Sequence, residues 1–155
     1  MTNPFWDFSL ASYSRDGVPG SCLALQDDFN LDVNMLLYGA WLASQDKRLD
    51  TEHLAALEVV IKPWREQVVE PLRALRRRWR EYPPAGVLRG EVKRLELQAE
   101  RQQQDMMLAF LQAASEPPAA CQPLEENLVQ VACFTCPDQA GWRQPVRRLA
   151  SKLSP

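Results

Sequence analysis

A nearly unbroken apolar run between residues 31 and 43 constrains the fold of this chain most strongly. Its only strongly polar residues are Asp32 and Asn34. A helix over this run would carry apolar side chains on every face, which is typical of a helix surrounded by other helices. The Asp32 carboxylate suits the position before the helix, where it can accept a backbone N–H and interact with the helix dipole. We therefore predict a central buried helix from Asp32 to about Asp46.

Helical periodicity extends through most of the remaining chain, and no alternating strand pattern is present. Asn3 and Pro4 are typical of a helix start. Two long apolar stripes follow, joined by a loop at residues 82–86, and Pro63 and Pro71 should end or bend the first of them. The first stripe contains Trp64, Val68, Leu72, Leu75, Trp79 and Tyr82. The second contains Leu88, Val92, Leu95, Ala99, Gln102, Met106, Ala109 and Ala113. The matching stripes predict an antiparallel hairpin over residues 64–113.

The predicted fold class is therefore all-α, a compact bundle of about five to seven helices. A chain of 155 residues with 46% hydrophobic composition can bury one sizeable core. We predict a helical domain over residues 1–113 and a linker rich in proline and alanine over 114–123. Residues 124–155 would add a short helix and a loosely held tail.

The cellular location is expected to be cytoplasmic. No segment reaches the roughly 20 apolar residues that span a bilayer, and the N-terminal residues lack the pattern of a signal peptide. The four cysteines are then expected to be reduced thiols.

Three segments resemble a family of small uncharacterised proteobacterial proteins that share a domain of unknown function. They are FWDFS at residues 5–9, LDVNMLL at 31–37 followed by WLA at 41–43, and WREQVVEPLRALR at 64–76. The resemblance covers about residues 4–113. It implies a cytoplasmic bacterial protein, and it supplies no activity, ligand or catalytic residue.

Charge is distributed unevenly along the chain. Residues 1–60 hold three basic and nine acidic side chains, whereas residues 61–94 hold ten basic and four acidic ones. Four arginines that recur near helical spacing are candidate partner-binding residues: Arg73, Arg76, Arg77 and Arg80. Their guanidinium groups could bind carboxylates of a protein partner or of a second copy, or they could pair with the acidic first third of the chain. The pI of about 5.5 makes nucleic acid an unlikely partner.

Candidate catalytic and metal-binding residues are few, and we expect no cofactor. Cys133 and Cys136 have the spacing of half a zinc site, but no second pair accompanies them. Two small buried residues on one helical face are the preferred explanation of this spacing. His53 is the only histidine and is expected at the surface, and the carboxylates near Asp32 are explained by helix capping.

Two functions remain open from the sequence. The preferred one is a non-enzymatic protein-interaction or regulatory adaptor that uses the arginines, with no role for a membrane. The alternative is a helical enzyme or small-molecule-binding protein whose site lies between the central helix and the tryptophan-bearing helices. That pocket would use Asp32, Asn34, Trp41 and Trp64, although core packing of the tryptophans is favoured.

Overall fold

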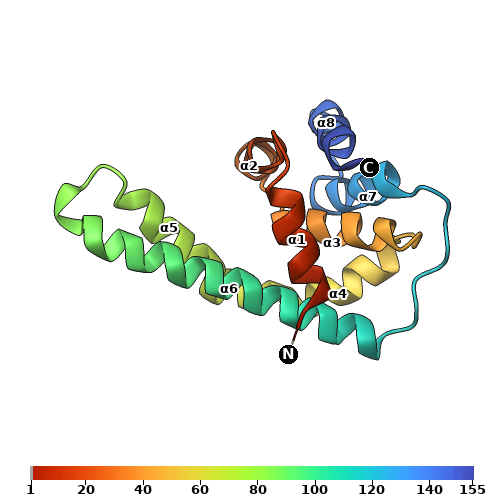
Figure 1. The fold of residues 1–155 in the computed structure, drawn as a ribbon, viewed down its shortest axis with the longest axis horizontal. Helices are drawn as coiled ribbons and strands as arrows, with labels where there is room; N and C mark the ends of the chain where they lie inside the picture. Colours follow the sequence, from red (N-terminus) through yellow and green to blue (C-terminus); the bar gives the residue numbers. More distant parts are fainter. Residues whose placement is uncertain (1) are drawn as a thin grey trace. The chain divides into compact units, whose positions relative to one another are not determined.

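The protein is all-α in a computed structural model that describes residues 2–155 (Figure 1). The helices are α1 (Pro4–Tyr13), α2 (Val18–Phe29), α3 (Val33–Ser44), α4 (Thr51–Trp64), α5 (Glu70–Arg78), α6 (Gly86–Ala113), α7 (Leu124–Thr135) and α8 (Arg143–Leu153). A π-helical turn at Arg65–Val69 joins α4 to α5 without a break, so the described residues form seven helical rods. The predicted fold class is confirmed.

The helices fall into two compact units. Unit 1 combines Met1–Ala55 with Ser115–Pro155, and unit 2 is Ala56–Ala114. Helix α4 begins in unit 1 and ends in unit 2. The independent folding of residues 1–113 stays a prediction, because these units describe packing in the complete chain.

Helix α3 is the buried helix of unit 1, as the apolar run predicted. Every residue from Asn34 to Ala43 is buried, and α3 packs against α1, α2 and α7. The Asp32 carboxylate accepts the Asn34 backbone N–H at 2.8 Å, which caps the helix start. Trp41 is 6% exposed and stacks on Phe5 with ring centroids 5.2 Å apart. The predicted position of Trp41 in the core is therefore confirmed.

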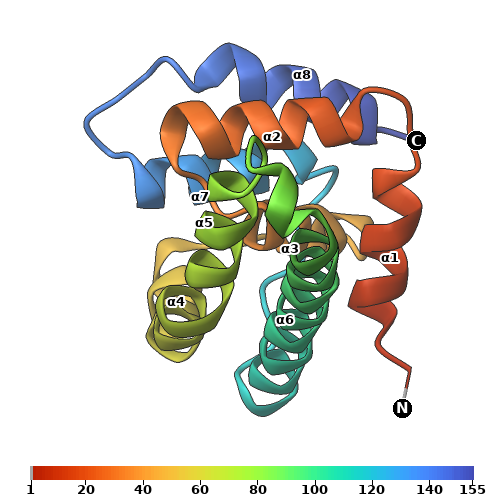
Figure 2. The same ribbon diagram turned by 90° about the vertical axis from the view of Figure 1, so that its left-hand side faces the viewer.

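The C-terminal part of the chain completes unit 1. Helix α7 packs against α3, and α8 lies beside α2 and packs against it (Figure 2). Residues 143–153, which the sequence placed in a loosely held tail, instead form α8. Its apolar side chains Val146 and Leu149 are fully buried. Helix α8 was difficult to predict from the sequence, because a helix of 11 residues with four basic side chains shows only a narrow apolar stripe.

The segment expected to be a linker is fixed to the turn after α3. The Arg48 N–H donates to the Pro118 carbonyl and the Ala120 N–H donates to the Asp46 carbonyl, each at 2.8 Å. Asn127 on α7 is buried and forms further hydrogen bonds with this region. The Asn127 side-chain oxygen accepts the Leu49 N–H at 2.8 Å. Its amide nitrogen donates to the carbonyls of Gly39 at 3.0 Å and Lys47 at 2.9 Å.

Unit 2 is dominated by the predicted hairpin, in which α5 and the π turn pack along α6. Pro63 lies inside α4 without ending it, and the π turn follows directly. Proline removes a backbone donor and crowds the preceding turn, and here a single π turn follows it before the α-helix resumes. Helix α6 has 28 residues. Among residues 2–155 no helix has the length and apolar character needed to cross a membrane.

Candidate functional site

An ionic cluster occupies one side of the α5–α6 hairpin. Arg73 Nε lies 3.3 Å from a Glu96 carboxylate oxygen, and Arg73 Nη2 lies 3.3 Å from Glu100. Arg76 binds both carboxylate oxygens of Glu96 through Nε and Nη2. The Glu96 side chain is only 8% exposed. This carboxylate is therefore held by two guanidinium groups that neutralise it and satisfy its oxygens.

The cluster divides the four arginines that the sequence proposed as partner-binding residues. Arg73 and Arg76 are already paired inside the hairpin, and their carboxylates come from α6 rather than from the acidic first third of the chain. Arg77 and Arg80 are exposed, as is Arg78 between them. Of these exposed arginines, Arg78 and Arg80 are the ones that we consider as a basic surface near the end of α5.

The buried line along α6 differs from the predicted stripe. Its members are Val92, Glu96, Ala99, Gln103 and Met107, and Gln104 is buried beside them. Leu88 and Leu95 of the predicted stripe are 59% and 48% exposed. The sequence prediction was wrong here because it followed apolar residues alone, whereas two polar side chains, Glu96 and Gln103, lie on the buried line. The Glu96 ion pairs make such burial tolerable.

The opposite side of the hairpin is apolar and partly exposed. At 3.6 residues per turn, Leu88 and Leu95 lie beside the buried line of α6, away from Glu100. On α5, Leu72, Leu75 and Trp79 lie beside the arginines that form the cluster. Because the ion pairs fix which sides of the two helices meet, these apolar residues share the other side. We name this surface the apolar flank, consisting of Leu72, Leu75, Trp79, Leu88 and Leu95.

His53 is not a surface histidine, contrary to the sequence prediction. It is half-buried in unit 1, with Nε2 2.7 Å from the Tyr38 hydroxyl and with its ring stacked on the Tyr38 ring. Burial lowers the pKa of His53, and the nearby Asp50 carboxylate opposes that shift. Burial also raises the pKa of Tyr38. The pair belongs to the packing of α3 against the start of α4.

The cysteines do not come together with other metal ligands. Cys133 is exposed, while the Cys136 thiol donates to the Phe29 carbonyl at 3.0 Å. Cys22 is buried, and burial raises its pKa to about 12. No group of three histidine, cysteine or carboxylate side chains in the described part of the chain is placed to hold a metal ion.

The four residues of the alternative pocket each have a structural contact. Asp32 caps α3 and Asn34 is buried within it. Trp41 stacks on Phe5, and in unit 2 the Trp64 indole N–H donates to the Ala99 carbonyl at 2.9 Å.

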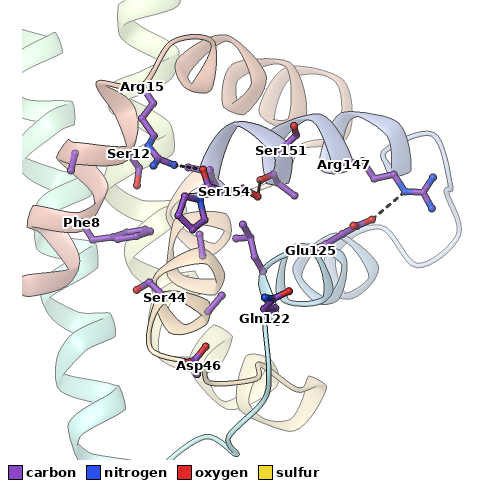
Figure 3. A pocket seen from close by; sticks show the side chains of 17 residues that line it. Phe8, Ser12, Arg15, Ser44, Asp46, Gln122, Glu125, Arg147, Ser151 and Ser154 are labelled. Carbon is purple, nitrogen blue, oxygen red and sulfur yellow. Dashed lines mark hydrogen bonds and ion pairs between the residues drawn. The ribbon is translucent and has the colours of Figure 1, made fainter.

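A cleft of about 820 Å³ lies elsewhere in unit 1, and these four residues are not among those that line it. It is bordered by α1, the C-terminal end of α3, the start of α7, and α8 (Figure 3). Sequence reasoning did not find the cleft, because its walls come from segments far apart in the chain.

Comparison with known proteins gives a family without a known activity. Residues 4–107 match the family described as "Protein of unknown function (DUF2390)". No curated protein and no solved structure matches the chain significantly. The matched residues include α3 and most of the α5–α6 hairpin, and they end before α7 and α8.

Proposed function

This chain belongs to the DUF2390 family, and we propose that it is a non-enzymatic protein-interaction protein that binds its partner through the α5–α6 hairpin. The proposed occupant of the apolar flank is an acidic amphipathic helix of another protein. The resemblance to proteobacterial proteins supports a cytoplasmic setting for this interaction.

The observation that carries the proposal is the exposure of the apolar flank. Leu88 and Leu95 are about half exposed, and no residue of α5 is buried. Exposed leucines at helical spacing beside half-buried aromatic and aliphatic side chains are typical of surfaces that bind an amphipathic helix. A hairpin built only for its own stability would be expected to bury these positions.

The chemistry of the partner follows from the charge around the flank. Residues 72–94 contain eight basic and two acidic side chains. Within the ionic cluster, Glu96 pairs with Arg73 and Arg76, and Glu100 pairs with Arg73. The exposed Arg78 and Arg80 favour carboxylates beside the apolar contact. Complementary charge would also accelerate association, and binding would weaken as salt increases.

The test is affinity capture from an extract of cells that produce the protein. The bait variants are Leu88→Glu and Leu95→Glu, with Leu97→Glu as the matched control. Leu97 is 53% exposed on the same helix but lies on another side of it. We expect a partner that wild type and Leu97→Glu retain and that both flank variants lose, with recovery reduced at least about tenfold.

The captured protein must then bind the purified chain directly, through a segment that is acidic and amphipathic. Loss of the same partner with Leu97→Glu would show that the added charge, and not the flank, was responsible. Retention of every captured protein by both flank variants would overturn the proposal. Capture of only the chain itself would replace it with self-association.

A further inference from the structure

The cleft in unit 1 has a polar end built by one side of α1 and the turn after it. Phe8, Ala11, Ser12 and Arg15 are spaced so that they follow one another along that side, and all four line the cleft. The Arg15 backbone N–H also donates to the Ser12 carbonyl at 3.1 Å, which keeps the two residues adjacent. Figure 3 shows the Ser12 and Arg15 side chains together at one end of the cleft, with Asp46 at the other.

Arg15 is held in place while part of its guanidinium stays unused. Its Nη1 atom donates to the carbonyls of Lys152 and Ser154, each at 3.2 Å, at the C-terminal end of α8. A guanidinium carries five N–H groups, and these two bonds leave those of Nε and Nη2. Nε and Nη2 together form an edge that binds a carboxylate through two parallel hydrogen bonds. Within residues 2–155 no carboxylate forms an ion pair with Arg15.

Ser12 supplies a second unused donor at this end. The residue is only 6% exposed, and its hydroxyl has no hydrogen-bond partner in the described part of the chain. Two other serines of the cleft have partners, since Ser44 donates to the Trp41 carbonyl and Ser154 to the Ala150 carbonyl. A nearly buried serine that lines the cleft is suited to bind a polar group of a ligand through its hydroxyl.

Much of the rest of the lining is apolar, and one carboxylate in it is paired. Apolar side chains come from four helices and include Phe8, Ala11, Ala40, Ala43, Leu124, Ala150 and Leu153. Glu125 is paired with Arg147 at 3.1 Å. Asp46 at the far end disfavours a second negative charge on a ligand. A volume of about 820 Å³ falls within the range of sites for small organic molecules.

We propose that this cleft binds an amphipathic monocarboxylate. Its carboxylate accepts hydrogen bonds from the Nε and Nη2 groups of Arg15 and from the Ser12 hydroxyl. Its apolar body lies along Phe8 and the alanines of α3 and α8. The site belongs to unit 1 and does not depend on the hairpin surface proposed above.

The test is calorimetric titration of the purified full chain with two probes, octanoate and 4-phenylbutyrate. Each probe is compared with its uncharged primary amide, which keeps the apolar body and removes the charge. We expect the carboxylates to bind at least about tenfold more tightly than the amides, because charge-assisted hydrogen bonds to Arg15 are lost with the amide.

Three variants locate the site. Arg15→Gln should weaken carboxylate binding at least about tenfold, and Ser12→Ala about threefold to fivefold, with little change for the amides. Arg148→Gln, which removes an exposed cation of α8 that does not line the cleft, should bind as wild type does.

Melting curves accompany each titration because Arg15 also caps α8, and Ser12→Ala tests the site without that complication. Failure of both carboxylates to bind folded wild type at millimolar concentration would overturn the proposal. Equal binding of acid and amide would also overturn it, as would equal losses in Arg15→Gln and Arg148→Gln. The hairpin variant Leu88→Glu should retain full carboxylate binding, so this proposal and the proposed function can fail separately.

Discussion

At the scale of single residues, His53 shows how burial selects one protonation state. Its Nε2 atom lies 2.7 Å from the Tyr38 hydroxyl, and the two rings stack with centroids 5.7 Å apart. Burial lowers the pKa of His53, while Asp50, whose carboxylate accepts the His53 backbone N–H, partly opposes this shift. Tyr38 and Asp50 are ionisable groups in contact with the histidine, and the lowered pKa favours the neutral imidazole in the folded protein.

This environment predicts a loss of stability in mild acid. The pKa of His53 in the folded state is below its unfolded value of about 6.5. The unfolded state therefore binds more protons below that pH. The contribution of His53 should be fully present above about pH 7 and should decline as the pH falls through 6.5 toward the folded-state pKa. Urea unfolding of wild type and His53→Gln across this range measures it. A stability difference between the two proteins that does not change with pH would contradict the prediction.

At the scale of elements, the sequence predicted the positions of those helices that depend on signals within a few residues. The apolar run and Asp32 located α3, and the paired stripes located the hairpin, because periodicity and capping act within a few residues. The buried side of α6 was missed because Glu96 lies in the interface, and its burial depends on Arg73 and Arg76 in another helix. Nothing in the sequence around Glu96 indicates that its carboxylate pairs with arginines of another helix.

The ionic cluster predicts which carboxylate of α6 stabilises the hairpin. Glu96→Gln removes both ion pairs and leaves two partly buried guanidinium groups without their shared carboxylate, which should cost about 2–3 kcal/mol. Glu91→Gln on the same helix removes only the exposed pair with Arg94 and should cost less than about 0.5 kcal/mol. Urea unfolding followed by circular dichroism gives both values. Similar values for the two variants would mean that the cluster contributes no more than a surface pair.

At the scale of the whole molecule, the first and last segments of the chain form one unit. The family match ends at residue 107, yet α7 and α8 pack against α3 and α2. The cleft likewise combines α1 with α7 and α8. Its residues could not be predicted from the sequence, because Arg15 and Ser12 have no distinctive spacing to residues near 150. Only the fold brings them together.

Asn127 predicts how strongly the C-terminal segment is tied to unit 1. Asn127→Ala would leave the Leu49 N–H and the carbonyls of Gly39 and Lys47 without their buried partner. We expect a loss of about 3 kcal/mol in the free energy of unfolding. Gln130→Ala on the same helix removes only a long contact of 3.4 Å with Thr51 and serves as the control, with an expected loss below about 0.5 kcal/mol. Equal, small losses of unfolding free energy in the two variants would show that the Asn127 hydrogen bonds do not hold α7 against the rest of unit 1.

Because unit 1 is built from both ends of the chain, it cannot be completed until the C-terminal helices have been synthesised. Unit 2 is one continuous segment whose helices contact neighbours close in sequence, so we expect it to fold before the chain is complete. Helices α1 to α3 emerge earlier but must wait for α7 and α8 before their apolar surfaces are covered. We therefore expect the first third of the newly made chain to stay incompletely packed until residues near 153 have been added. During that interval the most apolar helix of the protein is the part most in need of protection by chaperones.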